Sequence, residues 1–222
     1  MYRLIRPLMA LCAVTLTISA FAPRANAQGF PTFFIRLFRP YHQVALAQLP
    51  EVEKDLKLTE DQKTKTLDLF DKLNEERGAL FQEAAGDFES IREDMAKLNS
   101  DIAKEFNDTL DEAQRKRLAE IYVQANAGAA LTDDAIATAL KLTDEQQKKL
   151  ADLRVGAREA FQGVDWQSLE EEEAEKKVDE VIAEQDKGYA AVLTAEQKTE
   201  FEKMQGEKLE IDLKNLPNPF GG

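Results

Sequence analysis

The sequence holds few residues of the kinds that carry out catalysis or bind transition metals. Its 222 residues include one histidine, His42, and one cysteine, Cys12. Transition-metal sites draw on several histidine or cysteine ligands, and a calcium loop of the D-x-D-x-D-G type is also missing. No nucleophile elbow, catalytic triad or phosphate-binding loop is recognisable. We therefore predict a protein that is not an enzyme, with no catalytic residue, no cofactor and no bound metal.

Acidic side chains are the one abundant chemical group. There are 42 Asp and Glu residues against 29 Lys and Arg, which gives a formal net charge of -13. The run Glu170 to Glu173 could be taken for an ion-binding cluster. The i, i+4 spacing of Glu172 with Lys176 and of Glu173 with Lys177 instead predicts ion pairs along a solvated helix face. Because so negative a chain repels nucleic acid and anionic lipid, we predict no nucleic-acid partner and no polybasic membrane contact.

The N-terminus has the pattern of a secretory signal peptide. Arg3 and Arg6 precede an apolar run of about 15 residues, and small residues lead up to Ala27. Such a run is short for a membrane span, which needs roughly 20 residues. Cleavage between Ala27 and Gln28 removes the only cysteine and three arginines, so the net charge changes from -13 to -16. We predict a signal peptide at 1–27, export to the periplasm, and no membrane span in the cleaved protein.

Beyond residue 46 the apolar residues recur at the spacing of a helix. Steps of three and four residues separate Ala84, Phe88, Ile91, Met95, Leu98, Ile102 and Phe106. No proline occurs between Leu56 and Lys208, so nothing forces a break within these helices. The pattern predicts an all-α fold.

The sequence also repeats itself. The segment LKLTEDQ at 56–62 returns as LKLTDEQ at 140–146, an offset of 84 residues. We predict a tandem duplication of an antiparallel helical hairpin, with unit one at 46–129 and unit two at 130–213. The two pseudo-symmetric units are expected to pack into one bundle, because each alone is small for a complete core. An irregular tail is predicted at 214–222.

Four segments share a helix-start motif: LTEDQ, LDEAQ, LTDEQ and LTAEQ. In each, Thr or Asp is followed three residues later by Gln, which is the pattern of a capping box. The first side chain accepts a hydrogen bond from the N3 backbone N–H, and the Gln side chain accepts one from the N–H of the cap residue. The preceding Leu is expected to fill the core at the turn. The motif residues are Leu58, Thr59, Gln62, Leu110, Asp111, Gln114, Leu142, Thr143, Gln146, Leu193, Thr194 and Gln197.

Four such boxes in an exported helical chain resemble the LTxxQ-motif family of Spy/CpxP-like periplasmic chaperones and stress sensors. The resemblance covers about residues 46–205, with LDEAQ as a degenerate fourth motif. It implies hairpins whose cupped surface holds partly unfolded clients or a sensor partner without ATP. Family members typically carry two motifs and dimerise, so four motifs in one chain predict a monomeric pseudo-dimer, with a homodimer as the alternative. The family's chaperone is also known for a basic cradle, whereas this chain is acidic.

The segment at 28–45 is the notably aromatic and basic part of the exported chain. Three interpretations are open: an arm that docks to a partner or membrane surface, a patch that binds clients, or a strap packed across the bundle, as the usual burial of Phe favours. The candidate partner-binding residues are Phe30, Phe33, Phe34, Phe38 and Tyr41.

Three functions follow as hypotheses. The first is an ATP-independent chaperone or envelope-stress modulator, which would show an exposed apolar groove. The second is a structural or protein-interaction module that is covered on every face and docks through its N-terminal arm. The third is a carrier of a small apolar ligand, which requires a closed apolar pocket between the units.

Overall fold

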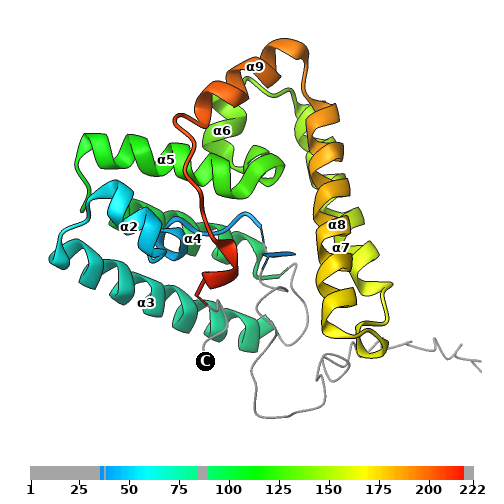
Figure 1. The fold of residues 1–222 in the computed structure, drawn as a ribbon, viewed down its shortest axis with the longest axis horizontal. Coiled ribbons are helices and arrows are strands. Elements are labelled where there is room, and N and C mark those ends of the chain that lie inside the picture. The colour runs from blue at the N-terminus through cyan, green and yellow to red at the C-terminus, as the bar shows by residue number, and fades with distance from the viewer. Residues whose placement is uncertain (1–35, 38, 85–89, 218–222) are drawn as a thin grey trace, which may run out of the picture.

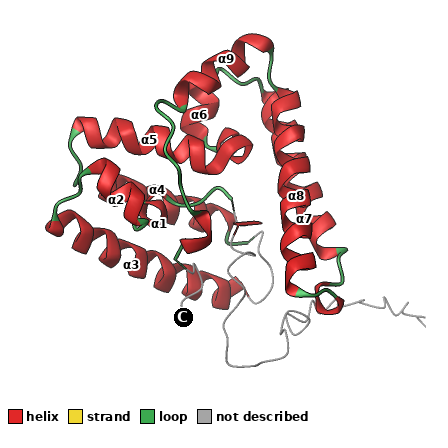
Figure 2. Ribbon diagram, in the orientation of Figure 1, coloured by secondary structure: helices red, strands yellow, loops and turns green. Residues whose placement is uncertain are grey.

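The computed structural model describes residues 36–37, 39–84 and 90–217 (Figure 1). Over these residues the protein is all-helical and has no strand (Figure 2). None of the described helices has the length and apolar character needed to cross a membrane. Several predicted features lie outside the described residues: the signal peptide, its cleavage residues Ala27 and Gln28, and the arm residues Phe30, Phe33, Phe34 and Phe38.

The elements follow one another along the chain in a simple order. They are α1 (Gln43–Leu46), α2 (Pro50–Leu56), α3 (Glu60–Ala84), α4 (Arg92–Asn107), α5 (Glu112–Asn126), the 3-10 helix η3 (Ala127–Thr132), α6 (Asp134–Ala139), α7 (Asp144–Gln162), η4 (Trp166–Ser168), α8 (Glu171–Val192), α9 (Ala195–Met204) and η5 (Leu213–Asn215).

Two pairs of long helices run antiparallel. In the first, Lys65 of α3 pairs with Glu105 of α4 at 2.7 Å, and Arg77 donates to Asn99 at 3.1 Å. In the second, α7 and α8 approach closely, because a Cβ atom on Gly188 would lie 2.9 Å from the Leu153 side chain. The α7/α8 pair lies beside the group formed by α2 to α5 (Figure 1).

The short helices α2 and α6 end in the same way, 84 residues apart. Lys57 has φ 53° and Lys141 has φ 51°, so both adopt the left-handed conformation that ends many helices. The next residue then bonds back across the turn, with Leu58 donating to Glu53 O at 3.1 Å and Leu142 donating to Ala137 O at 2.9 Å. The backbone turns into α3 and α7 are therefore built alike.

One main hydrophobic core runs through the described helices. Its fully buried side chains include Leu69, Phe106, Leu118, Ile121 and Tyr189, which come from both antiparallel helix pairs and from α5. The leucine before each capping box also belongs to this core, with at most 7% of its surface exposed. These four residues are Leu58, Leu110, Leu142 and Leu193.

The 3-10 helix η3 forms the joint between α5 and the α7/α8 pair. A Cβ atom on Gly128 would lie 2.8 Å from the Tyr189 Cβ, so only glycine allows α8 to pack this closely. Ala130 and Leu131 are almost completely buried beside it. The joint is therefore part of the packed interior.

The described part of the N-terminal arm packs across α5 and α8. Tyr41 is only 6% exposed, and its backbone N–H donates to the side-chain oxygen of the buried Asn126 at 2.5 Å. The Arg39 guanidinium donates to Asp186 at 3.0 Å and to Gln185 at 3.2 Å. Arg39 and Tyr41 of the arm thus pack against the helices, while the arm's phenylalanines lie outside the described residues.

Replacing Asn126 with Ala should destabilise the protein strongly. The Asn126 amide accepts from Tyr41 N–H and donates to Tyr41 O and Tyr122 O, so its loss leaves several buried backbone groups unpaired. We expect the free energy of unfolding to fall by about 2–4 kcal/mol, measured by urea titration. The same change at exposed Asn215 is the control and should cost about 0.5 kcal/mol or less. Equal losses for the two variants would contradict a structural role for the buried amide.

Candidate functional site

The glutamines of the first two capping boxes bind each other. Gln62 Nε2 donates to Gln114 Oε1 at 2.8 Å, and Gln114 Nε2 donates back to Gln62 Oε1 at 3.1 Å. Each Oε1 also accepts the N–H of its own cap residue, Thr59 or Asp111. Each Nε2 also donates to a backbone carbonyl of the partner turn: Gln62 to Thr109 O at 2.9 Å, Gln114 to Leu56 O at 3.1 Å. We call this reciprocal pair an amide clasp.

A second amide clasp repeats the arrangement in the α7/α8 half. Gln146 Nε2 donates to Gln197 Oε1 at 2.7 Å, and Gln197 Nε2 donates back at 3.2 Å. The remaining N–H groups reach Val192 O at 2.9 Å and Leu140 O at 3.2 Å. The bonded carbonyls of the two clasps therefore lie at equivalent places in the sequence repeat.

The clasp explains why the motif ends in glutamine. A carboxamide has two N–H donors and an oxygen that accepts two hydrogen bonds, and each clasped amide uses all four. A glutamate could cap the helix through its oxygens but could not donate to the partner. The first clasp therefore joins the end of α2, the start of α3 and the start of α5, and it fixes the position of α5 beside α2.

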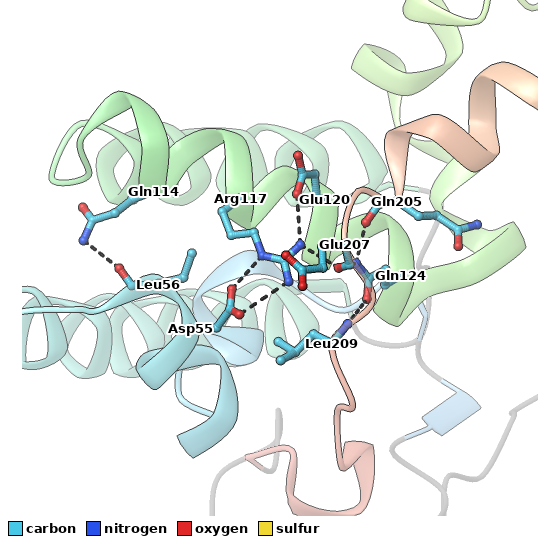
Figure 3. Close-up of polar contacts among 9 residues, drawn as sticks. All are labelled: Asp55, Leu56, Gln114, Arg117, Glu120, Gln124, Gln205, Glu207 and Leu209. Atoms are coloured by element: carbon cyan, nitrogen blue, oxygen red, sulfur yellow. Dashed lines mark hydrogen bonds and ion pairs between the residues drawn. The ribbon is translucent and has the colours of Figure 1, made fainter.

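This position brings one polar face of α5 against α2 and the C-terminal segment (Figure 3). Arg117, Glu120 and Gln124 lie on that face, because spacings of three and seven residues return to the same side of a helix. We call residues 205–217 the C-terminal strap. It follows α9 and runs back across α5 toward the first helix pair (Figure 1).

Arg117 forms a charged junction at the centre of this face. Its Nε lies 2.6 Å from Asp55 Oδ2 of α2, and its Nη1 lies 2.9 Å from Glu120 Oε2. Hydrogen bonding to Asp55 is the main cause that raises the pKa of Arg117 above its usual range, so the guanidinium stays charged. The same Nη1 donates to Glu207 O of the strap at 2.7 Å. One guanidinium thus joins α2, α5 and the strap.

Gln124 binds the backbone of the strap through both ends of its amide. Its Nε2 donates to Gln205 O and, at 2.7 Å, to Glu207 O. Its Oε1 accepts the Leu209 N–H at 2.9 Å (Figure 3). On α2, Glu51 Oε1 accepts the Asp212 N–H at 2.7 Å. All of these contacts fall on peptide groups of the strap and not on its side chains.

The strap turns onto α5 at Gly206. This residue has φ +60°, and a Cβ there would collide with the Glu120 carboxylate, so both the backbone and the available space call for glycine. Beyond the turn the side chains alternate. Leu209, Ile211 and Leu213 are partly buried against the main core, while the charged residues between them are exposed. Such alternation is typical of an extended chain, and the strap is free of helix from Gly206 to Asp212, just before η5 begins.

Two residues that the sequence singles out, Tyr41 as a partner-binding candidate and His42 as the single histidine, both make contacts within the protein. Tyr41 is buried, and its hydroxyl donates to Arg36 O at 3.1 Å. Both ring nitrogens of His42 have protein partners: Nε2 donates to Asn99 O at 2.9 Å and Nδ1 accepts Val44 N–H at 3.3 Å. Within the described residues, no group of three or more His, Cys, Asp or Glu side chains could hold a metal ion.

The acidic run at 170–173 is exposed where α8 begins, but both expected ion pairs are wrong: among the described residues Glu172 does not pair with Lys176, and Glu173 does not pair with Lys177. Glu171, Glu172 and Glu173 occupy the first turn of α8, where the helix dipole favours negative charge. Lys177 pairs with Glu180 at 2.9 Å instead of with Glu173, whose carboxylate accepts the Glu170 N–H.

Sequence reasoning missed the strap and its partners on α5. The predicted second unit reached residue 213, whereas residues 205–213 contact α5 and α2 of the predicted first unit. The alternation of Leu209, Ile211 and Leu213 with charged residues was the available signal. Nothing in the sequence marks Arg117 or Gln124, because their role depends on what the clasp places opposite them.

Comparisons with protein-family models, with curated proteins and with solved structures find no match for this chain. The resemblance to the LTxxQ-motif family therefore stays a prediction based on the four boxes.

Replacing Gln62 with Glu should break the first amide clasp. The carboxylate can still accept the Thr59 N–H, but it cannot donate to Thr109 O or to Gln114 Oε1 and places negative charge beside them. We expect a loss of about 2–3 kcal/mol in the free energy of unfolding at pH 7, with partial recovery at acidic pH as the carboxyl gains a proton to donate. The matched control is Gln82→Glu on the exposed face of the same helix, α3, which should change stability by less than about 0.5 kcal/mol. A Gln62→Glu protein as stable as this control would contradict the clasp.

The single histidine should make stability depend on pH. Burial is the main cause that lowers the pKa of His42 from 6.5 to about 4, the nearby Arg77 charge lowers it further, and the hydrogen bond to Asn99 opposes the shift. The unfolded chain therefore takes up a proton first as the pH falls. The stability linked to neutral His42 is complete above about pH 6.5 and is lost as the pH falls through about 4, by about 3 kcal/mol.

Comparison of the wild type with His42→Gln isolates this contribution, because the carboxyl groups of the chain titrate in both proteins. The stability difference between them should shrink by about 3 kcal/mol between pH 7 and pH 4. The NMR titration of the one histidine gives the pKa directly, and a value near 6.5 in the folded protein would refute the assignment.

Proposed function

We propose that the protein is an exported, non-enzymatic helical binding protein that holds extended polypeptide segments, as an ATP-independent periplasmic chaperone or envelope-stress modulator. The observation that carries this proposal is the way α5 holds the strap. Gln124 and Arg117 bind its carbonyl and N–H groups, and such contacts do not depend on the sequence of the bound chain. A protein that holds varied unfolded segments needs contacts of this kind.

The surface charge is compatible with this role. Predicted cleavage leaves a net charge of -16, which keeps such a protein soluble while it holds an aggregation-prone client. The two amide clasps would supply a rigid frame for two helix pairs within one chain, in keeping with the proposed monomeric pseudo-dimer.

A second candidate is a structural or protein-interaction module that docks through its N-terminal arm. One observation favours it: where side chains are described, the strongly exposed large apolar residues are Leu67 and Val155, at 52% and 56%. The hollow between α3 and α4, about 410 Å³, is lined by Lys72, Glu76 and Asp101 as well as by apolar groups. Among the residues whose exposure is described, no wide apolar surface groove is formed.

The proposed function predicts that residues 28–222 slow the aggregation of a chemically denatured client at a one-to-one ratio without ATP. Light scattering should fall by at least half, and an equally acidic inert protein should have no effect. If a several-fold excess leaves aggregation unchanged, the holding function is wrong.

The interaction module has its own test. Removing residues 28–35 keeps Arg39 and Tyr41 in place, so the fold should survive. Loss of binding to a defined partner with an unchanged thermal midpoint would favour docking through the arm.

A further inference from the structure

The C-terminal strap lies on α5 as a bound peptide would. Its contacts with α5 and α2 fall on peptide groups: the carbonyls of residues 205 and 207 and the N–H groups of residues 209 and 212. Lys208 and Glu210 are exposed and bind nothing on this surface. The strap is therefore held by its backbone and by apolar side chains at alternate positions, and the charged side chains between them make no hydrogen bond or ion pair with the surface.

The strap fills this surface incompletely. A hollow of about 520 Å³ remains beside it, lined by Gln124 and Ala125 of α5 and by seven strap residues between Gln205 and Leu213. Leu209, Ile211 and Leu213 are only partly buried, whereas Leu216, near the end of the strap, is buried, with 5% of its surface exposed. The apolar side chains of the strap are therefore less completely buried than those of the core beneath it.

The strap also contacts the bundle through Leu216 in the main core and through the ion pair of Lys214 with Glu175 of α8, but it takes no part in the helix junctions. The last helix before it, α9, ends at Met204, and the chain turns at Gly206, directly after the first carbonyl that Gln124 binds. The amide clasps that hold the helix junctions use no strap residue. The surface on α5 and α2 is thus formed by elements that are fixed independently of the strap.

We infer that this surface binds an extended, alternately apolar segment of a partner polypeptide, and that the strap occupies it in cis until such a segment displaces it. The inference rests on the proposed polypeptide-holding function and names its site. A segment tethered within the same chain acts at an effective concentration on the order of millimolar, so the strap excludes weakly bound segments. An unfolded chain that offers many alternately apolar segments competes better.

The first test uses the full chain with two matched double variants. Leu209→Gln with Ile211→Gln removes the apolar anchors of the strap. Lys208→Gln with Glu210→Gln makes the same replacement at the neighbouring exposed positions and leaves the net charge unchanged. The probe is a dye-labelled peptide with the sequence of residues 206–217, followed by fluorescence anisotropy.

The variant with Leu209→Gln and Ile211→Gln, which we call the released variant, should bind this peptide at least ten-fold more tightly than the wild type or the control variant with Lys208→Gln and Glu210→Gln. Adding Gln124→Ala to the released variant should remove the gain, as should a peptide of the same composition whose apolar residues are adjacent. If the released variant retains its helical circular dichroism but binds no peptide, the inference is overturned.

The second test needs no variant and separates the two proposals. A reduced, carboxymethylated globular protein serves as a permanently unfolded probe, and hydrogen exchange is measured on the wild-type chain. Binding of the probe should accelerate exchange at the Leu209 and Asp212 amides while α8 remains protected. If the probe binds and suppresses aggregation but strap exchange is unchanged, the holding function stands and this site is wrong. If the probe neither binds nor is protected from aggregation, the proposed function itself fails.

Discussion

A reciprocal pair of glutamine amides is the constraint on which the rest of this structure depends. The amide of Gln62 caps its own helix, binds the amide of Gln114 and closes onto the backbone of the partner turn. Four hydrogen-bonding functions on one short side chain thus join three helix ends, at a site close to water where apolar packing alone would be weak. The second clasp does the same at Gln146 and Gln197. Because these junctions are hydrogen-bonded at both ends of each helix pair's turn, the long helices can carry solvated charged faces on their other sides.

Helix α5 uses each part of its length for a different contact. Its first turn takes part in the clasp through Gln114, its middle turns carry Arg117 and Gln124 against the strap, and its last residue, Asn126, binds the backbone of the N-terminal arm. The neighbouring joint at Gly128 then brings α8 onto the same core. The polar face of α5 that meets the strap is therefore fixed at both ends of the helix, by the clasp and by the N-terminal arm.

The sequence could name the capping residues because a capping box is a local event, decided within four residues such as Thr59 to Gln62. It could also predict the all-α class, since the apolar spacing is regular. It could not show that Gln62 meets Gln114, because that pairing depends on how two distant turns pack. The left-handed Lys57 and Lys141 were equally hidden, since lysine carries no preference for that conformation. The strap was missed for a different reason: three alternating apolar residues are too short a pattern to outweigh the surrounding helical spacing.

The arm and the strap, which come from opposite ends of the described chain, are fastened two residues apart on α5. Tyr41 is held by Asn126, and Leu209 is held by Gln124. The last two turns of α5 therefore hold both ends of the described chain. Local opening from either end must first release the same helical turn. The two halves of the sequence repeat are therefore expected to unfold in a single cooperative transition, even though each has its own clasp.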